Sequence, residues 1–252
     1  MTNENVPQEV TPGGTMLRGG TVRLIMRNYF SSHLLAAAGM MVRSAGEIEE
    51  RHDVTGPSRF DLEQRGHVLG AILCGVGFFE AMINELFQDA FDGNSPEGGA
   101  IAPLPESTRD LMAEYWRATD LGKKGRALDK YQTLLRFAGK PLLDPGAQSY
   151  QDANLSVQLR NVIAHYRPED LSADESALME ERLKGKFSDN RLLTGSGNPW
   201  WPDHCLGVGC ARWVLESVVA VADHVVDAVG ARTNYRAHRE SGWLGPVPGA
   251  DV

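Results

Sequence analysis

The sequence predicts an all-α protein that forms one up-and-down bundle of about five to seven helices. Apolar residues recur every three or four positions in several long segments, the spacing of one face of a helix. No segment shows the every-second-residue alternation of a half-buried strand, and loops rich in Gly and Pro separate the helical segments. With 252 residues, 42% of them hydrophobic, the chain is long enough to bury a sizeable core.

The N-terminal part divides into a tail and a first helix. Residues 1–20 are rich in Gly, Pro, Thr and Glu, and we expect them to be a mobile tail. Helical spacing of apolar residues predicts the first helix over residues 21–50, followed by a turn over residues 53–57. We expect a single domain over residues 21–230 and a C-terminal tail over residues 231–252.

The second helix carries the most complete apolar stripe of the chain. We expect it to begin at Ser58, with Asp61 three residues later as a capping partner, and to extend to Ala90. Gly75 and Gly77 lie inside it and lower its helix propensity by about 1 kcal/mol each relative to Ala. Close packing of a neighbouring helix against these two positions explains their presence.

The same spacing predicts the remaining helices. They begin at about residue 107 and cover about 123–138, 147–166, 172–183 and 205–229. The loop over residues 189–202 contains Trp200 and Trp201 between two prolines. These tryptophans either stack on bases or clamp the loop onto the bundle, and we favour the clamp.

Composition limits the compartment and the partners. The N-terminus has neither the basic nor the apolar region of a signal peptide, and no run approaches 18 uninterrupted apolar residues, so we expect no membrane span. Three scattered cysteines fit a reducing cytoplasm. Because the net charge is −8, any nucleic-acid site must be locally positive. The short basic runs at residues 123–126 and 184–186 are interpreted as solvated surface charge.

The helix before Pro168 carries the chemistry of this sequence. Its predicted core face consists of apolar side chains, Leu155, Leu159, Val162 and Tyr166. Arg160, Asn161 and His165 lie outside that face. Pro168 disfavours helical geometry in the residue before it, so His165 falls in the last turn. There the helix dipole favours a protonated imidazole by about 0.3–1 kcal/mol, and a histidine can give or take protons near neutral pH.

Helical geometry restricts how these side chains cooperate. At about 100° per residue, Asn161 and His165 are roughly 40° apart around the helix, whereas Arg160 and His165 are roughly 140° apart. One substrate meets both Arg160 and His165 only if the arginine curls around the helix end, or if a second copy of the helix faces the first. A two-fold homodimer provides the second arrangement.

The stretch from Leu159 to His165, Leu-Arg-Asn-Val-Ile-Ala-His, resembles the signature of the HEPN superfamily. That signature has an Arg followed after four to six residues by His, often with a polar residue directly after the Arg. Its late position in an all-helical, HEPN-like bundle also matches. The resemblance covers residues 155–168 at the level of the motif, and about 22–230 only at the level of architecture.

The resemblance implies a metal-independent endoribonuclease whose site is shared across a homodimer, as in toxins and in defence or stress effectors. His165 would be the general base or acid near the ribose 2′-hydroxyl, Arg160 would stabilise the phosphorane, and Asn161 would orient His165 or the phosphate. A regulatory or antitoxin protein is an implied partner. Some HEPN toxins carry a Tyr two residues after the His, where a partner nucleotidyltransferase modifies it; here that residue is Arg167, so we do not expect silencing by that route.

Other residues extend or compete with this interpretation. Glu80 and Asn84 share one face of the second helix, and they either line the same cleft with Tyr166 and Arg167 as substrate-binding residues or form a polar flank. HEPN-like modules also bind RNA, a nucleotide or a protein without cutting, and a third alternative is a structural dimer in which the motif is accidental and Arg160 or His165 forms salt bridges.

Metal and cofactor chemistry are not expected. Asp203, His204, Cys205 and Cys210 match no standard zinc spacing, and we expect both cysteines to be buried small hydrophobes. No phosphate-binding Gly-rich loop opens a helix, and no Gly-x-Ser-x-Gly elbow occurs, so kinase, dinucleotide and serine-hydrolase chemistries are unsupported.

Overall fold

The computed structural model of the chain describes residues 28–52, 56–93, 99–118, 125–166 and 179–236. Within these ranges it has six α-helices, two short helical turns and no strand, which confirms the predicted all-helical class. The α-helices are α1 (Phe30–Glu50), α2 (Leu62–Phe91), α3 (Glu106–Ala118), α5 (Ala127–Phe137), α6 (Gln148–Ala164) and α8 (Val208–Val229). The short turns are η1 (Arg191–Leu193) and η2 (Trp200–His204). The predicted tail over residues 1–20 lies outside the described residues.

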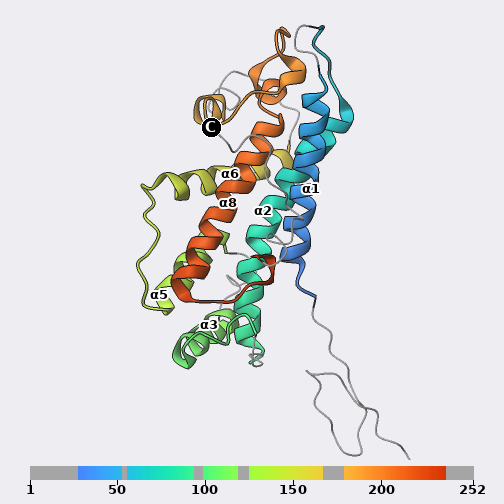
Figure 1. The fold of residues 1–252 in the computed structure, drawn as a ribbon. Coiled ribbons are helices and arrows are strands. Elements are labelled where there is room, and N and C mark those ends of the chain that lie inside the picture. Colours follow the sequence, from blue (N-terminus) through green and yellow to red (C-terminus); the bar gives the residue numbers. More distant parts are fainter. Residues whose placement is uncertain (1–27, 53–55, 94–98, 119–124, 167–178, 237–252) are drawn as a thin grey trace, which may run out of the picture.

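Helices α1, α2 and α8 run side by side along the bundle, and α6 crosses them (Figure 1). α2 is the central helix, because its buried face contacts α1, α8, α3, α5 and α6. Among the described helices, only α2 is long and apolar enough to cross a membrane. The core helix of a soluble protein can have the same length and hydropathy. Half of its most apolar window is buried within the bundle.

Glycines in α2 allow its two neighbours to approach. A Cβ atom at Gly75 would lie 3.4 Å from Leu215 in α8, and one at Gly77 would lie 3.5 Å from Leu34 in α1. The expected role of both glycines in packing is confirmed. Gly70, which the sequence did not single out, is tighter, since a Cβ there would lie 2.4 Å from the sulfur of Met41.

The N-terminus of α2 differs from the prediction. Asp61, and not Ser58, is the N-cap: its side chain accepts a hydrogen bond from the Gln64 N–H at 3.0 Å. The residues before it are extended, and the Arg59 N–H donates to the Leu192 carbonyl at 2.8 Å. This contact with a distant loop keeps residues 58–60 out of the helix.

Two helices receive their N-terminal caps from another helix. The N-cap residues Tyr29 of α1 and Gly207 of α8 make no side-chain capping bond. Instead, the Glu85 carboxylate on α2 accepts from the Ser31 N–H at 2.9 Å, and the Glu49 carboxylate on α1 accepts from the Val208 N–H at 2.6 Å. Burial raises the pKa of both carboxyl groups, and the hydrogen bonds from these donors oppose the shift.

Two further boundaries differ from the sequence-based ones. α5 begins at Ala127, with Arg126 as an extended N-cap, and not near residue 123. The folded part continues past residue 230, because Tyr235 is 1% exposed and its ring packs edge-on against Phe78 at 5.0 Å. Of the weaker helix predicted over 172–183, residues 179–183 are described and helical.

Candidate functional site

The motif lies at the C-terminal end of α6. Leu155 and Leu159 are buried, as predicted. Val162 and Tyr166 were predicted to face the core, and this is wrong: they are 36% and 59% exposed. Helix α6 crosses α2 and α8 (Figure 1). Its last turn packs Ile163 against the core and exposes Val162 on another side.

Arg160 points back towards α2, where its Nη2 forms a hydrogen-bonded ion pair with the Glu80 carboxylate. The arginine side chain is 22% exposed, and its Nε is buried without a hydrogen-bond partner among the described residues. Glu80, which the sequence analysis placed near the motif, is thus in contact with the motif residue Arg160. The ion pair also matches what a structural role for Arg160 predicts.

A second cation, Lys130 on α5, lies close enough to Glu80 for the two charges to interact. It is 3% exposed, its Nζ donates to Asn84 Oδ1 at 2.7 Å, and it lies 5.5 Å from the centre of the Trp116 ring. Burial lowers the pKa of Lys130, and the charge of Glu80 opposes that shift. The charge of Glu80 therefore acts on two cations, Arg160 through an ion pair and Lys130 through a longer-range interaction.

Sequence analysis did not identify Lys130. The available signal was its register, since it stands three residues after Ala127 and four before Leu134, both of which are buried. A lysine on the apolar face of a helix needs a partner when it is buried. Asn84 and Glu80, which were considered a simple polar flank or a substrate-binding pair, supply that partner.

The other two motif residues are on the solvent side of α6. Asn161 and His165 are both exposed, and the backbone N–H of His165 donates to the backbone carbonyl of Asn161 at 3.0 Å. The helix ends at Ala164, at the predicted place. Tyr166 is exposed beside them, and Arg167 lies outside the described residues. The structure therefore brings Arg160, Glu80 and Asn84 together with Lys130, and leaves Asn161 and His165 open to solvent.

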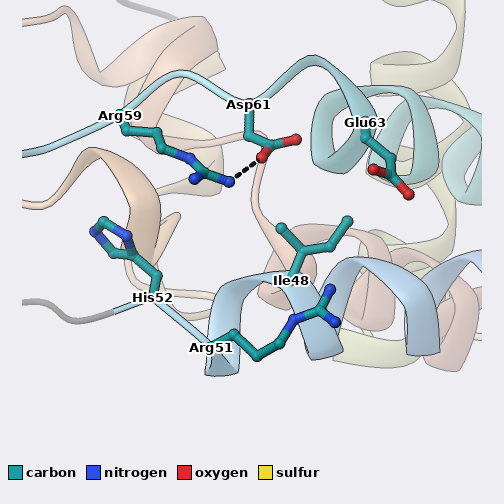
Figure 2. A pocket seen from close by; sticks show the side chains of 6 residues that line it. All are labelled: Ile48, Arg51, His52, Arg59, Asp61 and Glu63. Atoms are coloured by element: carbon teal, nitrogen blue, oxygen red, sulfur yellow. Dashed lines mark hydrogen bonds and ion pairs between the residues drawn. The ribbon is translucent and has the colours of Figure 1, made fainter.

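Pockets lined by described residues lie elsewhere. One of about 320 Å³ separates the end of α1 from the start of α2, and its wall includes the ion pair of Arg59 and Asp61 (Figure 2). The cationic Arg51 also lines it, opposite Glu63, so its permanent charges balance and favour neither an anion nor a cation. Another, of about 340 Å³, adjoins Glu85. Neither of these two pockets is lined by a motif residue.

The remaining candidates have structural roles. Trp200 and Trp201 are 9% and 6% exposed, and the Trp200 Nε1 donates to Asp189 at 2.9 Å, so the loop clamp is confirmed. Cys205 and Cys210 are fully buried, as expected. In the basic run at 184–186, Lys184 pairs with Glu180 and Lys186 pairs with Asp152, each at 2.7 Å. Among the described residues, no group of three or more His, Cys, Asp or Glu side chains is placed to hold a metal ion.

No family model, curated protein or solved structure matches this chain. Its function must therefore be argued from its own side chains and from the resemblance of residues 155–168 to the HEPN motif.

Proposed function

We propose that this chain is a metal-independent endoribonuclease of the HEPN type, acting as a homodimer in the cytoplasm as a toxin or as a defence or stress effector. One observation carries the proposal. Asn161 and His165 are exposed on one face of the last turn of α6, while Arg160, one residue before Asn161, is held by Glu80. This arrangement leaves an imidazole and an amide accessible to a substrate and holds the guanidinium in a fixed position on another side of the helix.

The chemistry uses the ribose 2′-hydroxyl of the substrate as the nucleophile. His165 takes the proton of the 2′-hydroxyl as that oxygen attacks the adjacent phosphorus, and a protonated histidine donates its proton to the departing 5′-oxygen. The bond between phosphorus and the 5′-oxygen breaks, leaving a 2′,3′-cyclic phosphate and a 5′-hydroxyl. Arg160 stabilises the negative charge of the phosphorane, and Asn161 orients the phosphate or His165.

A second copy of the chain completes this site in the proposal. Arg160 and His165 point to different sides of α6, so a two-fold arrangement that pairs two α6 ends places the arginine of one copy near the histidine of the other. Val162 and Tyr166, which are exposed apolar side chains in the same turn, would be covered by that contact.

The test is cleavage of mixed cellular RNA in EDTA. The parent is expected to cut and to leave cyclic-phosphate ends, whereas His165→Ala should be slower by about 10²–10⁴-fold, the usual contribution of general acid–base catalysis. His67→Ala is the matched control, because His67 is a half-exposed histidine on α2 beside a carboxylate. Equal cleavage by the parent and His165→Ala would contradict the assignment of His165.

A non-catalytic module that binds RNA, a nucleotide or a protein is the second candidate. The observation in its favour is the ion pair with Glu80, which occupies the guanidinium that the reaction requires. A folded and dimeric parent that retains a fluorescent oligonucleotide in anisotropy measurements, yet cuts no RNA, would support this candidate over the first.

A further inference from the structure

One face of α6 leads from the middle of the helix to His165 and carries no carboxylate. At about 100° per residue, four of its polar side chains fall within roughly 60° of arc. They are Asn154, Gln158, Asn161 and His165. With a rise of about 1.5 Å per residue they extend over roughly 16 Å, the last three turns of α6.

Two exposed arginines from other parts of the chain are fixed on this face. The Arg126 Nη2, from the residue before α5, donates to Asn154 Oδ1 at 2.8 Å. The Arg182 Nη1, from the helical residues 179–183, donates to Gln158 Oε1 at 2.7 Å. Both side chains are solvent-exposed, and they occupy consecutive turns of the polar face.

The partners of these arginines make them unusual in an acidic protein. Several exposed cations in the described part of the chain face a carboxylate, as Arg59 faces Asp61 and Lys184 faces Glu180. Arg126 and Arg182 hydrogen-bond instead to neutral amide oxygens, so their positive charges are oriented without being neutralised. A guanidinium has five N–H donors, and the remaining ones are available for phosphate oxygens.

We propose that this face of α6 binds the sugar–phosphate backbone of single-stranded RNA. In this arrangement Arg126 and Arg182 each bind a phosphate, and the strand runs along α6 so that a ribose arrives at His165. The inference rests on the proposed function and adds the direction of the substrate and two binding residues that lie outside the motif. It also meets the requirement that an acidic protein bind RNA through a locally positive surface.

Binding of a labelled single-stranded RNA to His165→Ala protein in EDTA separates this inference from catalysis. In that background, Arg126→Gln/Arg182→Gln is compared with Arg59→Gln/Lys184→Gln, a control with the same change in net charge at residues that already have carboxylate partners. Each phosphate contact to a single strand contributes about 0.7 to the slope of log K against log salt. Losing two contacts should lower that slope by about 1.4 and the affinity at about 0.1 M salt roughly 25-fold.

The outcomes distinguish the two levels of inference. The control should bind as the His165→Ala protein does, and Arg126→Lys/Arg182→Lys should keep the slope, because lysine retains the charge. If Arg126→Gln/Arg182→Gln binds RNA with the salt slope and affinity of the control, the proposal that this face of α6 binds RNA is wrong, and the proposed ribonuclease function is unaffected. If neither the parent nor any variant binds or cuts RNA while all are folded, the ribonuclease proposal falls, and the binding face falls with it.

Discussion

Replacement of Glu49 by alanine tests the tertiary caps of this fold. The side chain is 1% exposed, and its Oε1 accepts from the Val208 N–H at 2.6 Å and from Gln64 Nε2 at 2.7 Å. One carboxylate thereby ties the last turn of α1 to the first turns of α2 and α8. Alanine removes the acceptor from the Val208 N–H and leaves Gln64 Nε2 with only the longer bond to the Leu206 carbonyl at 3.4 Å. Each buried group that loses its partner costs about 1–3 kcal/mol. Removal of a buried charge offsets part of this, so we expect a net loss of about 2–4 kcal/mol.

Asp61→Ala is the matched control, because it removes a local N-cap whose loss costs about 1 kcal/mol. At roughly 2–4 °C per kcal/mol for a chain of this size, Glu49→Ala should lower the melting temperature by about 4–16 °C and Asp61→Ala by about 2–4 °C. Chemical denaturation monitored by circular dichroism gives the free energies. If Glu49→Ala proved no more destabilising than Asp61→Ala, the tertiary cap would not be a principal contact of the bundle.

The pH dependence of the same site has a definite sign. Burial raises the pKa of Glu49 above its ordinary value of 4.5, so folding favours the protonated form. The stability that this group contributes is fully present below pH 4.5 and is lost as the pH rises through the folded-state pKa. Relative to Glu49→Gln, which does not titrate, the parent should therefore lose stability as the pH rises from 4.5 through the folded-state pKa of Glu49. Parallel stability profiles for the two proteins would contradict the assigned shift.

Three further predictions concern the site and the packing. In a double-mutant cycle of unfolding free energies, Glu80→Gln and Arg160→Gln should show a coupling of about 0.5–1 kcal/mol that shrinks with added salt, because both side chains are partly exposed; zero coupling would show that the ion pair does not hold Arg160. Lys130→Met should weaken that coupling without opening a cavity, as measured in the same cycle. Gly66→Ala should stabilise the protein by up to about 1 kcal/mol, because nothing lies within 4 Å of the new Cβ atom. Gly207→Ala should destabilise it, because the new Cβ atom would lie 2.6 Å from the Asn190 backbone.

Much of the fold is predictable from local sequence because helix periodicity is a local property. The regular spacing of apolar residues in α2 and α8 specifies both their existence and their buried faces. Caps that come from another helix leave no such signal. Tyr29 is a poor N-cap by residue type, and Gly207 has no side chain that could accept a hydrogen bond. The carboxylates that cap these helices instead, Glu85 and Glu49, are distant in sequence. Only the packed structure brings these pairs together.

The errors in the site have the same origin. The apolar spacing of α6 continues to Tyr166, so Val162 and Tyr166 were expected to be buried, but both are exposed. Likewise, Lys130 belongs to the site only because α5 places it against α2. A periodic pattern reports which side chains share a face, and it carries no information on where the neighbouring helix ends.

The uncovered end of α6 connects the packing to the proposed chemistry. An apolar pair exposed in one turn, Val162 and Tyr166, is a cost that a single chain does not recover, whereas pairing of two α6 ends would bury it. The same pairing would bring together Arg160, which Glu80 holds against α2, and a solvent-exposed His165. A monomer in solution would thus argue against the ribonuclease, because neither the apolar surface nor the separation of Arg160 from His165 would then be resolved.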